Sequence, residues 1–134
     1  MKFYNLHIDF EPSWDTYNRI TEVLNVIPRD FEKSRFNIHD EPSNWHYQIV
    51  EDEEVTDKPI DFINVLLDIV EPNFSKLKRV GIEKDNILFW LVYEYQHQCS
   101  MEFHPEEMER LGKSGIGLNI DCLDGLKIKK TKAE

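Results

Sequence analysis

The chain has 134 residues and a formal net charge of -10, because 26 acidic residues outnumber 16 lysines and arginines. A field of this sign repels phosphate backbones, which argues against nucleic acid as a partner and favours a basic protein. The same acidic surface also serves solubility. The length predicts one domain, and a hydrophobic content of 40% is enough for a core that needs no disulfide.

The expected compartment follows from two negative observations. The opening stretch MKFYNLHIDF is too polar and too short for a signal peptide, and no apolar run reaches the length of a membrane span. We therefore expect a cytoplasmic protein that does not associate with membranes. The two cysteines, Cys99 and Cys122, fall in predicted strands, and we interpret them as small buried hydrophobic residues. A bridge between them would require those strands to be neighbours.

The first half of the chain predicts a strand, a helix and a second strand. Residues 2–10 alternate polar and apolar side chains, as in a half-buried strand. Ser13 can cap a following helix, which Pro28 limits. The inward positions of that helix recur every three or four residues and are Tyr17, Ile20, Val23, Leu24 and Ile27. Residues 29–44 predict a long loop with a short strand near 35–39, and residues 45–50 alternate as the second strand.

Two helices are predicted next. Asp57 can cap the first of them, with Pro59 in its first turn and Pro72 at its end. Its apolar face is the broadest in the chain and consists of Ile60, Phe62, Ile63, Leu66, Leu67, Ile69 and Val70. A short helix over residues 73–80 follows, and Gly81 closes it.

Residues 86–104 form the centre of the predicted sheet. The run 87–95 is apolar on both faces, which places Trp90 in the core. Residues 99–104 alternate apolar and polar side chains, which predicts an antiparallel partner and therefore a hairpin. Pro105 then opens a helix with Met108 and Leu111 facing inward and Gly112 as its end. Residues 116–122 alternate as the last strand.

These elements predict an α+β fold with a single mostly antiparallel β-sheet and helices packed on one face. We expect one domain over residues 1–126. Residues 127–134, KIKKTKAE, form a basic tail that we expect to be frayed.

Five stretches carry a family resemblance. They are LHIDF, RITEVLNVIP, SNWHYQI, INVLLDIVEP with Leu77 following, and GIGLNIDC, and they span most of residues 4–122. With these stretches the chain resembles a small bacterial family catalogued as domain of unknown function 4279. The resemblance implies an α+β fold and a bacterial origin. It implies no enzyme activity, because the matching residues are core and boundary positions.

The residues that could carry chemistry form no known motif. No two of the five histidines have the helical spacing of a zinc pair, and none forms a ligand pattern with a cysteine. A metal site at His97 and His104 is conceivable, but an exposed hairpin rim is the favoured interpretation. Cys99 beside these histidines lies in an acidic stretch, which disfavours a reactive thiolate. We therefore expect no catalytic residue, no metal and no cofactor.

The acidic side chains instead suggest a binding role. The run at residues 51–54 can be a solvated turn or a contact for a basic partner. We interpret the chain as a non-catalytic acidic bacterial binding protein, for example an immunity protein that neutralises a basic, nuclease-type toxin. The candidate partner-binding residues are Glu51, Asp52, Glu53, Glu54, Glu94, Glu106, Glu107 and the aromatic Trp14.

Two alternatives stay open. The first is a small-ligand-binding protein or enzyme with a site between helix and sheet, for which His46, Gln48 and Asn119 are the polar candidates. The second is a homodimer closed through an exposed sheet edge, which is compatible with either function.

Overall fold

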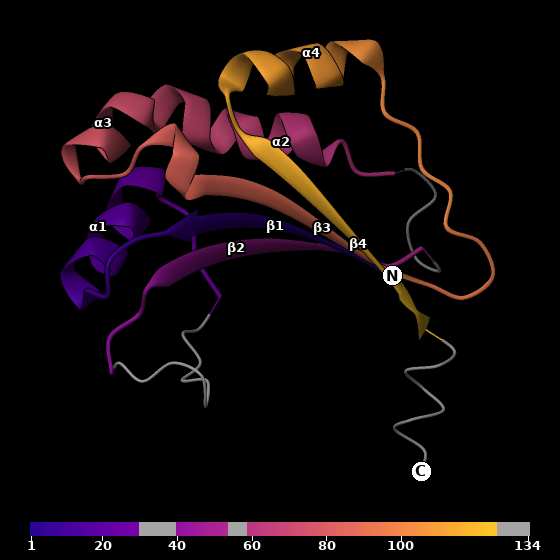
Figure 1. Cartoon of the computed structure of the whole chain (residues 1–134), viewed down its shortest axis with the longest axis horizontal. Helices are drawn as coiled ribbons and strands as arrows, with labels where there is room; N and C mark the ends of the chain where they lie inside the picture. Colours follow the sequence, from indigo (N-terminus) through magenta and orange to yellow (C-terminus); the bar gives the residue numbers. More distant parts are fainter. Residues whose placement is uncertain (30–39, 54–58, 126–134) are drawn as a thin grey trace.

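A computed structural model describes residues 1–29, 40–53 and 59–125 (Figure 1). The strands are β1 (Lys2–Asp9), β2 (Asn44–Glu51), β3 (Ile87–Tyr95) and β4 (Gly117–Asp124). The helices are α1 (Trp14–Leu24), α2 (Phe62–Val70), α3 (Phe74–Arg79) and α4 (Pro105–Ser114), with short 3₁₀ turns η1 (Glu71–Asn73) and η2 (Lys84–Asn86). The predicted strand near 35–39, the Asp57 cap and the basic tail lie outside the described residues.

The strands form one sheet in the order β2-β1-β3-β4. β1 pairs antiparallel with both β2 and β3, whereas β3 pairs parallel with β4. The α+β class is therefore confirmed, with a mixed sheet in which only the last pairing is parallel. A parallel pair needs a crossover connection, and the segment containing α4 supplies it.

The predicted hairpin is wrong. Residues 98–104 form no strand, because both edges of β3 are already occupied by β1 and β4. The alternation in this segment has another cause, since Met101 and Phe103 pack against the core from an extended connection. This segment, residues 96–104, links the end of β3 to the start of α4.

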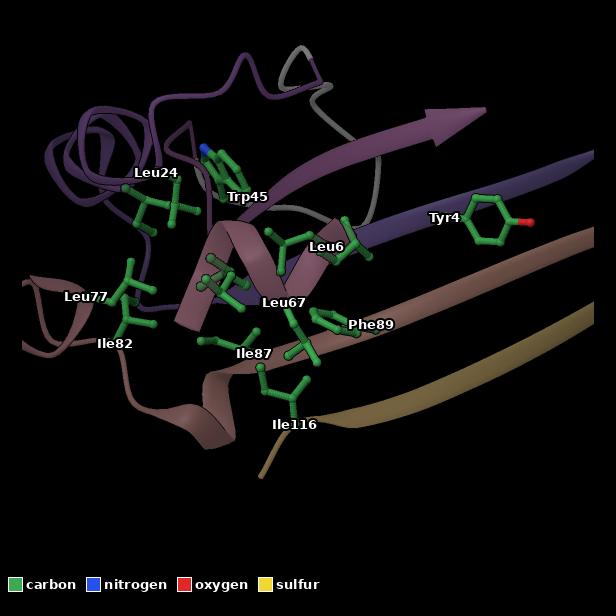
Figure 2. Close-up of a cluster of buried hydrophobic side chains, with 14 of the residues drawn as sticks. Tyr4, Leu6, Leu24, Trp45, Leu67, Leu77, Ile82, Ile87, Phe89 and Ile116 are labelled. Carbon is green, nitrogen blue, oxygen red and sulfur yellow. The ribbon is translucent and has the colours of Figure 1, made fainter. Parts of the chain in front are cut away.

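The core lies between the helices and one face of the sheet (Figure 2). Leu6 and Phe89 are fully buried on β1 and β3. Above them the predicted apolar face of α2 is buried except at Ile69, and Ile60 precedes the helix and is half-buried. Burying each such side chain contributes roughly 1.5–3 kcal/mol. Trp45 is also fully buried, and its indole Nε1 donates to Thr21 Oγ1 at 3.0 Å, which ties β2 to α1.

Two predicted inward positions and one predicted helix end are wrong. Ser13 caps α1 as expected, but the helix ends at Leu24 because Asn25 adopts a left-handed conformation with φ 54°. Ile27 therefore lies beyond the helix and is 88% exposed. Gly112 does not end α4, which continues to Ser114 and stops at Gly115, with φ 77°. Met108 is 52% exposed.

Two further elements differ in detail. Asp61, rather than a residue before Pro59, caps α2 by accepting a hydrogen bond from the Asn64 amide at 3.4 Å. Arg110 of α4 holds the helix layer together by donating to Asn64 at 2.6 Å and to Asp68 at 2.8 Å on α2.

The predicted burial of both cysteines is wrong. Cys122 lies on an edge strand, and Cys99 lies in the connection after β3.

Candidate functional site

The helices of the described residues all lie on one face of the sheet and leave the other face uncovered (Figure 1). Tyr4, Leu6 and Ile8 of β1 point into the core, so the alternate residues point to the opposite side. Cross-strand register extends that side over all four strands. We call this surface the open face, and it consists of Phe3, Asn5, His7, Asp9, Asn44, His46, Gln48, Val50, Leu88, Trp90, Val92, Glu94, Gly117, Asn119, Asp121 and Leu123.

The open face mixes apolar side chains with the amides Asn5, Gln48 and Asn119, and it has carboxylates at its margins. Trp90 lies on the central strand β3 and is half-buried, which corrects its predicted place in the core. Val50 is 49% exposed, and its neighbour across the strands is Phe3. Asp9 and Asp121 are exposed, and neither lysine nor arginine occurs among these strand positions.

Two histidines meet on the open face. His7 and His46 lie directly opposite on β1 and β2, with ring centroids 4.4 Å apart. His7 Nδ1 is hydrogen bonded to His46 Nε2, and His7 Nε2 lies 2.6 Å from Asp9 Oδ1. Burial, together with the nearby His7 and Arg29, lowers the pKa of His46 to about 4. His46 is therefore neutral at pH 7 and forms one end of an Asp9–His7–His46 chain.

This histidine pair predicts a pH-dependent stability. Because the pKa of His46 is about 4 when folded and near 6.5 when unfolded, the unfolded chain binds more protons between these pH values. Stability is therefore lost as the pH falls from about 6.5 to about 4. After a discount for partial exposure, we expect His46→Gln to remove about 1–2 kcal/mol of this loss.

Chemical unfolding at pH 7 and pH 4.5, compared between the native chain and the variant, measures this effect. The same substitution at the exposed His97 provides the control, and His97→Gln is measured at the same two pH values. An equal loss of stability in all three proteins would mean that His46 is not its source.

A second cluster lies at the end of the sheet where β1 begins and β2 ends. Glu51 is only 3% exposed, and its carboxylate accepts hydrogen bonds from Tyr4 Oη at 3.1 Å and from the Ile60 amide at 2.5 Å. Lys2 Nζ lies 3.4 Å away. Burial first, and then the Glu51 charge, raise the pKa of Tyr4, so the phenol stays protonated as a donor. The interpretation of Glu51 as part of a solvated turn is therefore wrong.

A cavity of about 440 Å³ adjoins this cluster. Tyr4 and Phe62 stack within its wall with ring centroids 4.5 Å apart, and Phe103 meets Phe62 edge-on at 6.1 Å. Lys2 and Glu107 contribute charges of opposite sign to the lining. The site is thus a half-apolar pocket between the start of α2, the segment 96–104 and the sheet.

A family model described as Domain of unknown function (DUF4279) matches residues 4–125. The chain belongs to this family. The match covers α1 to α4 and all of the sheet except the first two residues of β1, so it includes most of the open face and of the cavity. Among the curated proteins and the solved structures, none matches the chain.

In this DUF4279 chain the predicted partner-binding residues do not form one surface. Glu51 is buried, whereas Glu53 is exposed and paired with Lys2 at 3.3 Å. Glu106 and Glu107 lie in the first turn of α4, on the helix side. Asp52 follows β2 and is half-buried, and Glu94 lies on the open face. Trp14 lies at the start of α1 and is 41% exposed. Glu54 lies outside the described residues.

The polar candidates for a site between helix and sheet lie elsewhere in the DUF4279 fold. His46, Gln48 and Asn119 all point to the open face, and Gln48 donates to Asn5 Oδ1 at 2.8 Å. Within residues 1–29, 40–53 and 59–125, no three His, Cys, Asp or Glu side chains are placed to hold a metal ion. In the same residues, no helix has the length and apolar character needed to cross a membrane.

Sequence reasoning missed Asp9, Asp121 and Trp90 as surface candidates. The sequence feature that could have identified them is the alternation within each strand, which separates inward from outward side chains. Grouping them needs the register between strands, because β1, β3 and β4 are distant in sequence.

Proposed function

We propose that this protein is a non-catalytic binding protein whose open face takes a basic protein partner. The observation that carries the proposal is a four-stranded sheet with its helices on one side (Figure 1). On the other side, Trp90 and further apolar side chains lie among polar ones, with carboxylates at the margins. Apolar side chains at the centre of an interface, surrounded by polar ones, are typical of stable protein complexes. Trp90 is the central anchor in this arrangement, because tryptophan is enriched among the residues that dominate binding energy.

Charge supports the choice of a basic partner. The chain has a net charge of -10. Three of its carboxylates, Asp9, Glu94 and Asp121, lie on the open face, and no lysine or arginine occupies a strand position there. Opposite charge raises association rates and disfavours acidic competitors. A protein with a phosphate-binding cleft has the required positive surface, so a nuclease-type toxin is the partner class that we favour. The role would then be that of a cytoplasmic immunity protein.

The size of the open face sets a requirement on the partner. Strands about 4.8 Å apart and about eight residues long make a surface of roughly 500 Å². A standard interface takes about 800 Å² from each partner. The partner must therefore extend beyond the sheet onto the neighbouring connections.

The experiment compares two variants with the same net charge. Asp9→Asn, Glu94→Gln and Asp121→Asn together remove three charges from the open face, whereas Glu106→Gln, Glu107→Gln and Glu109→Gln remove three from α4. Each tagged protein is used to capture proteins from source-cell lysate at low salt, and the bound protein is identified and then purified. We expect a lysine- and arginine-rich protein whose Kd rises at least tenfold with the open-face variant and less than threefold with the α4 variant.

Other outcomes are informative. Equal weakening by both variants would show that only net charge matters, and weakening by the α4 variant alone would move the interface to the helix side. The absence of any salt-sensitive basic partner for the native chain would overturn the proposal. Light scattering of the free protein tests the homodimer, which would use the edge strands β2 or β4.

The cavity beside Glu51 favours a second candidate function, small-ligand binding. Its volume of about 440 Å³ and its three aromatic rings fit a small amphipathic molecule. A ligand present at 100 times its Kd would stabilise the fold by about 2.7 kcal/mol. A thermal-shift screen would detect it, and Phe103→Ala should abolish the response.

A further inference from the structure

The two cysteines of the chain lie side by side on the surface. Cys99 and Cys122 are both exposed, and their sulfur atoms are 2.9 Å apart. A disulfide bond is about 2.05 Å long, so a small side-chain movement would bring the sulfurs to bonding distance. They are 23 positions apart in the sequence, so the fold itself creates this proximity.

The backbone explains how the pair forms. β3 and β4 run parallel, and Tyr93 of β3 lies opposite Cys122 of β4. The chain bends after β3 at residues 96–97, and Cys99 reaches the exposed end of β4. Ile120, also on the helix side of β4, is 46% exposed, so the helices leave this end of the edge strand accessible.

We propose that Cys99 and Cys122 are a thiol–disulfide site at which oxidation fastens the segment 96–104 to β4. The oxidant class is a small-molecule disulfide such as oxidised glutathione. One cysteine thiolate attacks that disulfide, forms a mixed disulfide and releases one glutathione thiolate. The second cysteine then attacks the protein sulfur and releases the other glutathione. Two protein thiols become one disulfide, and one small disulfide is reduced to two thiols.

The hydrogen bond to Cys99, followed by burial, raises the pKa of Cys122. The contact between the two sulfurs does not fix an order of attack. In the proposed exchange either cysteine attacks first, and the other resolves the mixed disulfide.

Oxidation of this cysteine pair would affect the cavity rather than the open face. Residues 100–104 line the cavity, and Met101 and Phe103 also pack against the core. A bond from Cys99 to Cys122 fixes one end of this wall to the sheet. Oxidation would therefore restrict opening of the cavity, independently of any partner on the open face.

The experiment uses the full chain equilibrated with oxidised or reduced glutathione. We expect both thiols to disappear after oxidation, with intact mass showing the loss of two hydrogens and a peptide map linking Cys99 to Cys122. Closing a loop of this length should raise the Tm by about 5–10 °C. Hydrogen exchange of the amides in residues 99–104 should slow in the oxidised protein.

The Cys99→Ser and Cys122→Ser variants are the matched controls and should show no oxidation-dependent change in Tm. The thiol count and mass of the native chain test the proposal even if a variant folds poorly. Two thiols that persist in oxidised glutathione, a separate glutathione on each cysteine, or a disulfide between two chains would each overturn it.

Discussion

Glu51→Ala is expected to lower the free energy of unfolding by about 3–5 kcal/mol, because it removes one partner of a buried ion pair. The carboxylate is 3% exposed and holds Tyr4, the Ile60 amide and Lys2. Truncation leaves the buried Tyr4 hydroxyl and the half-buried Ile60 amide without an acceptor. Urea unfolding followed by circular dichroism measures the loss.

Two controls separate charge from hydrogen bonding at this position. Glu51→Gln keeps an acceptor oxygen and should cost about 1–2 kcal/mol. Glu53→Gln removes the exposed partner of Lys2 and should cost less than about 1 kcal/mol. If Glu51→Ala were as mild as Glu53→Gln, the buried network would not stabilise the fold.

Trp45→Ala should have a comparable effect, about 3–5 kcal/mol, because it empties a fully buried site between β2 and α1. Trp45→Phe retains most of the packing but loses the hydrogen bond to Thr21, so we expect a smaller cost of about 1–2 kcal/mol. The same urea unfolding, followed by circular dichroism, applies to both variants.

Trp14 provides the matched control for Trp45. It is 41% exposed at the start of α1 and meets Tyr17 edge-on, with ring centroids 5.4 Å apart. Trp14→Ala should cost less than about 1.5 kcal/mol. A similar loss at both tryptophans would show that burial does not distinguish them.

The sequence predicted individual helices and strands better than it predicted which of them lie side by side. Periodicity identified the apolar stripe of α2 and the alternation of β1, because both patterns are local. The same alternation in residues 99–104 suggested a strand that does not exist. Whether an extended segment joins a sheet depends on free strand edges, and both edges of β3 are occupied by segments distant in sequence.

The candidate sites likewise combine local patterns that the sequence shows with contacts that only the fold creates. The acidic run 51–54 is visible in the sequence, but the burial of Glu51 depends on Lys2 and Tyr4, which lie beside it on the neighbouring strand β1 although they are more than 40 positions away in the sequence. The open face required the register of four strands before Asp9 and Asp121 could be placed on one surface. The thiol pair required the full three-dimensional structure, because Cys99 lies outside any strand and strand register alone does not place it beside Cys122.

The central place of β1 in the sheet has a consequence for folding while the chain is synthesised on the ribosome. β1 is synthesised before the other strands, yet one of its neighbours is β3, with Leu6 opposite Phe89. Most of the chain must emerge before that pairing can form, and the apolar edge of β1 stays unpaired until then. Pairings between such distant segments slow folding, and exposed edges invite aggregation. Until β3 has been synthesised, one edge of β1 therefore has no strand to pair with.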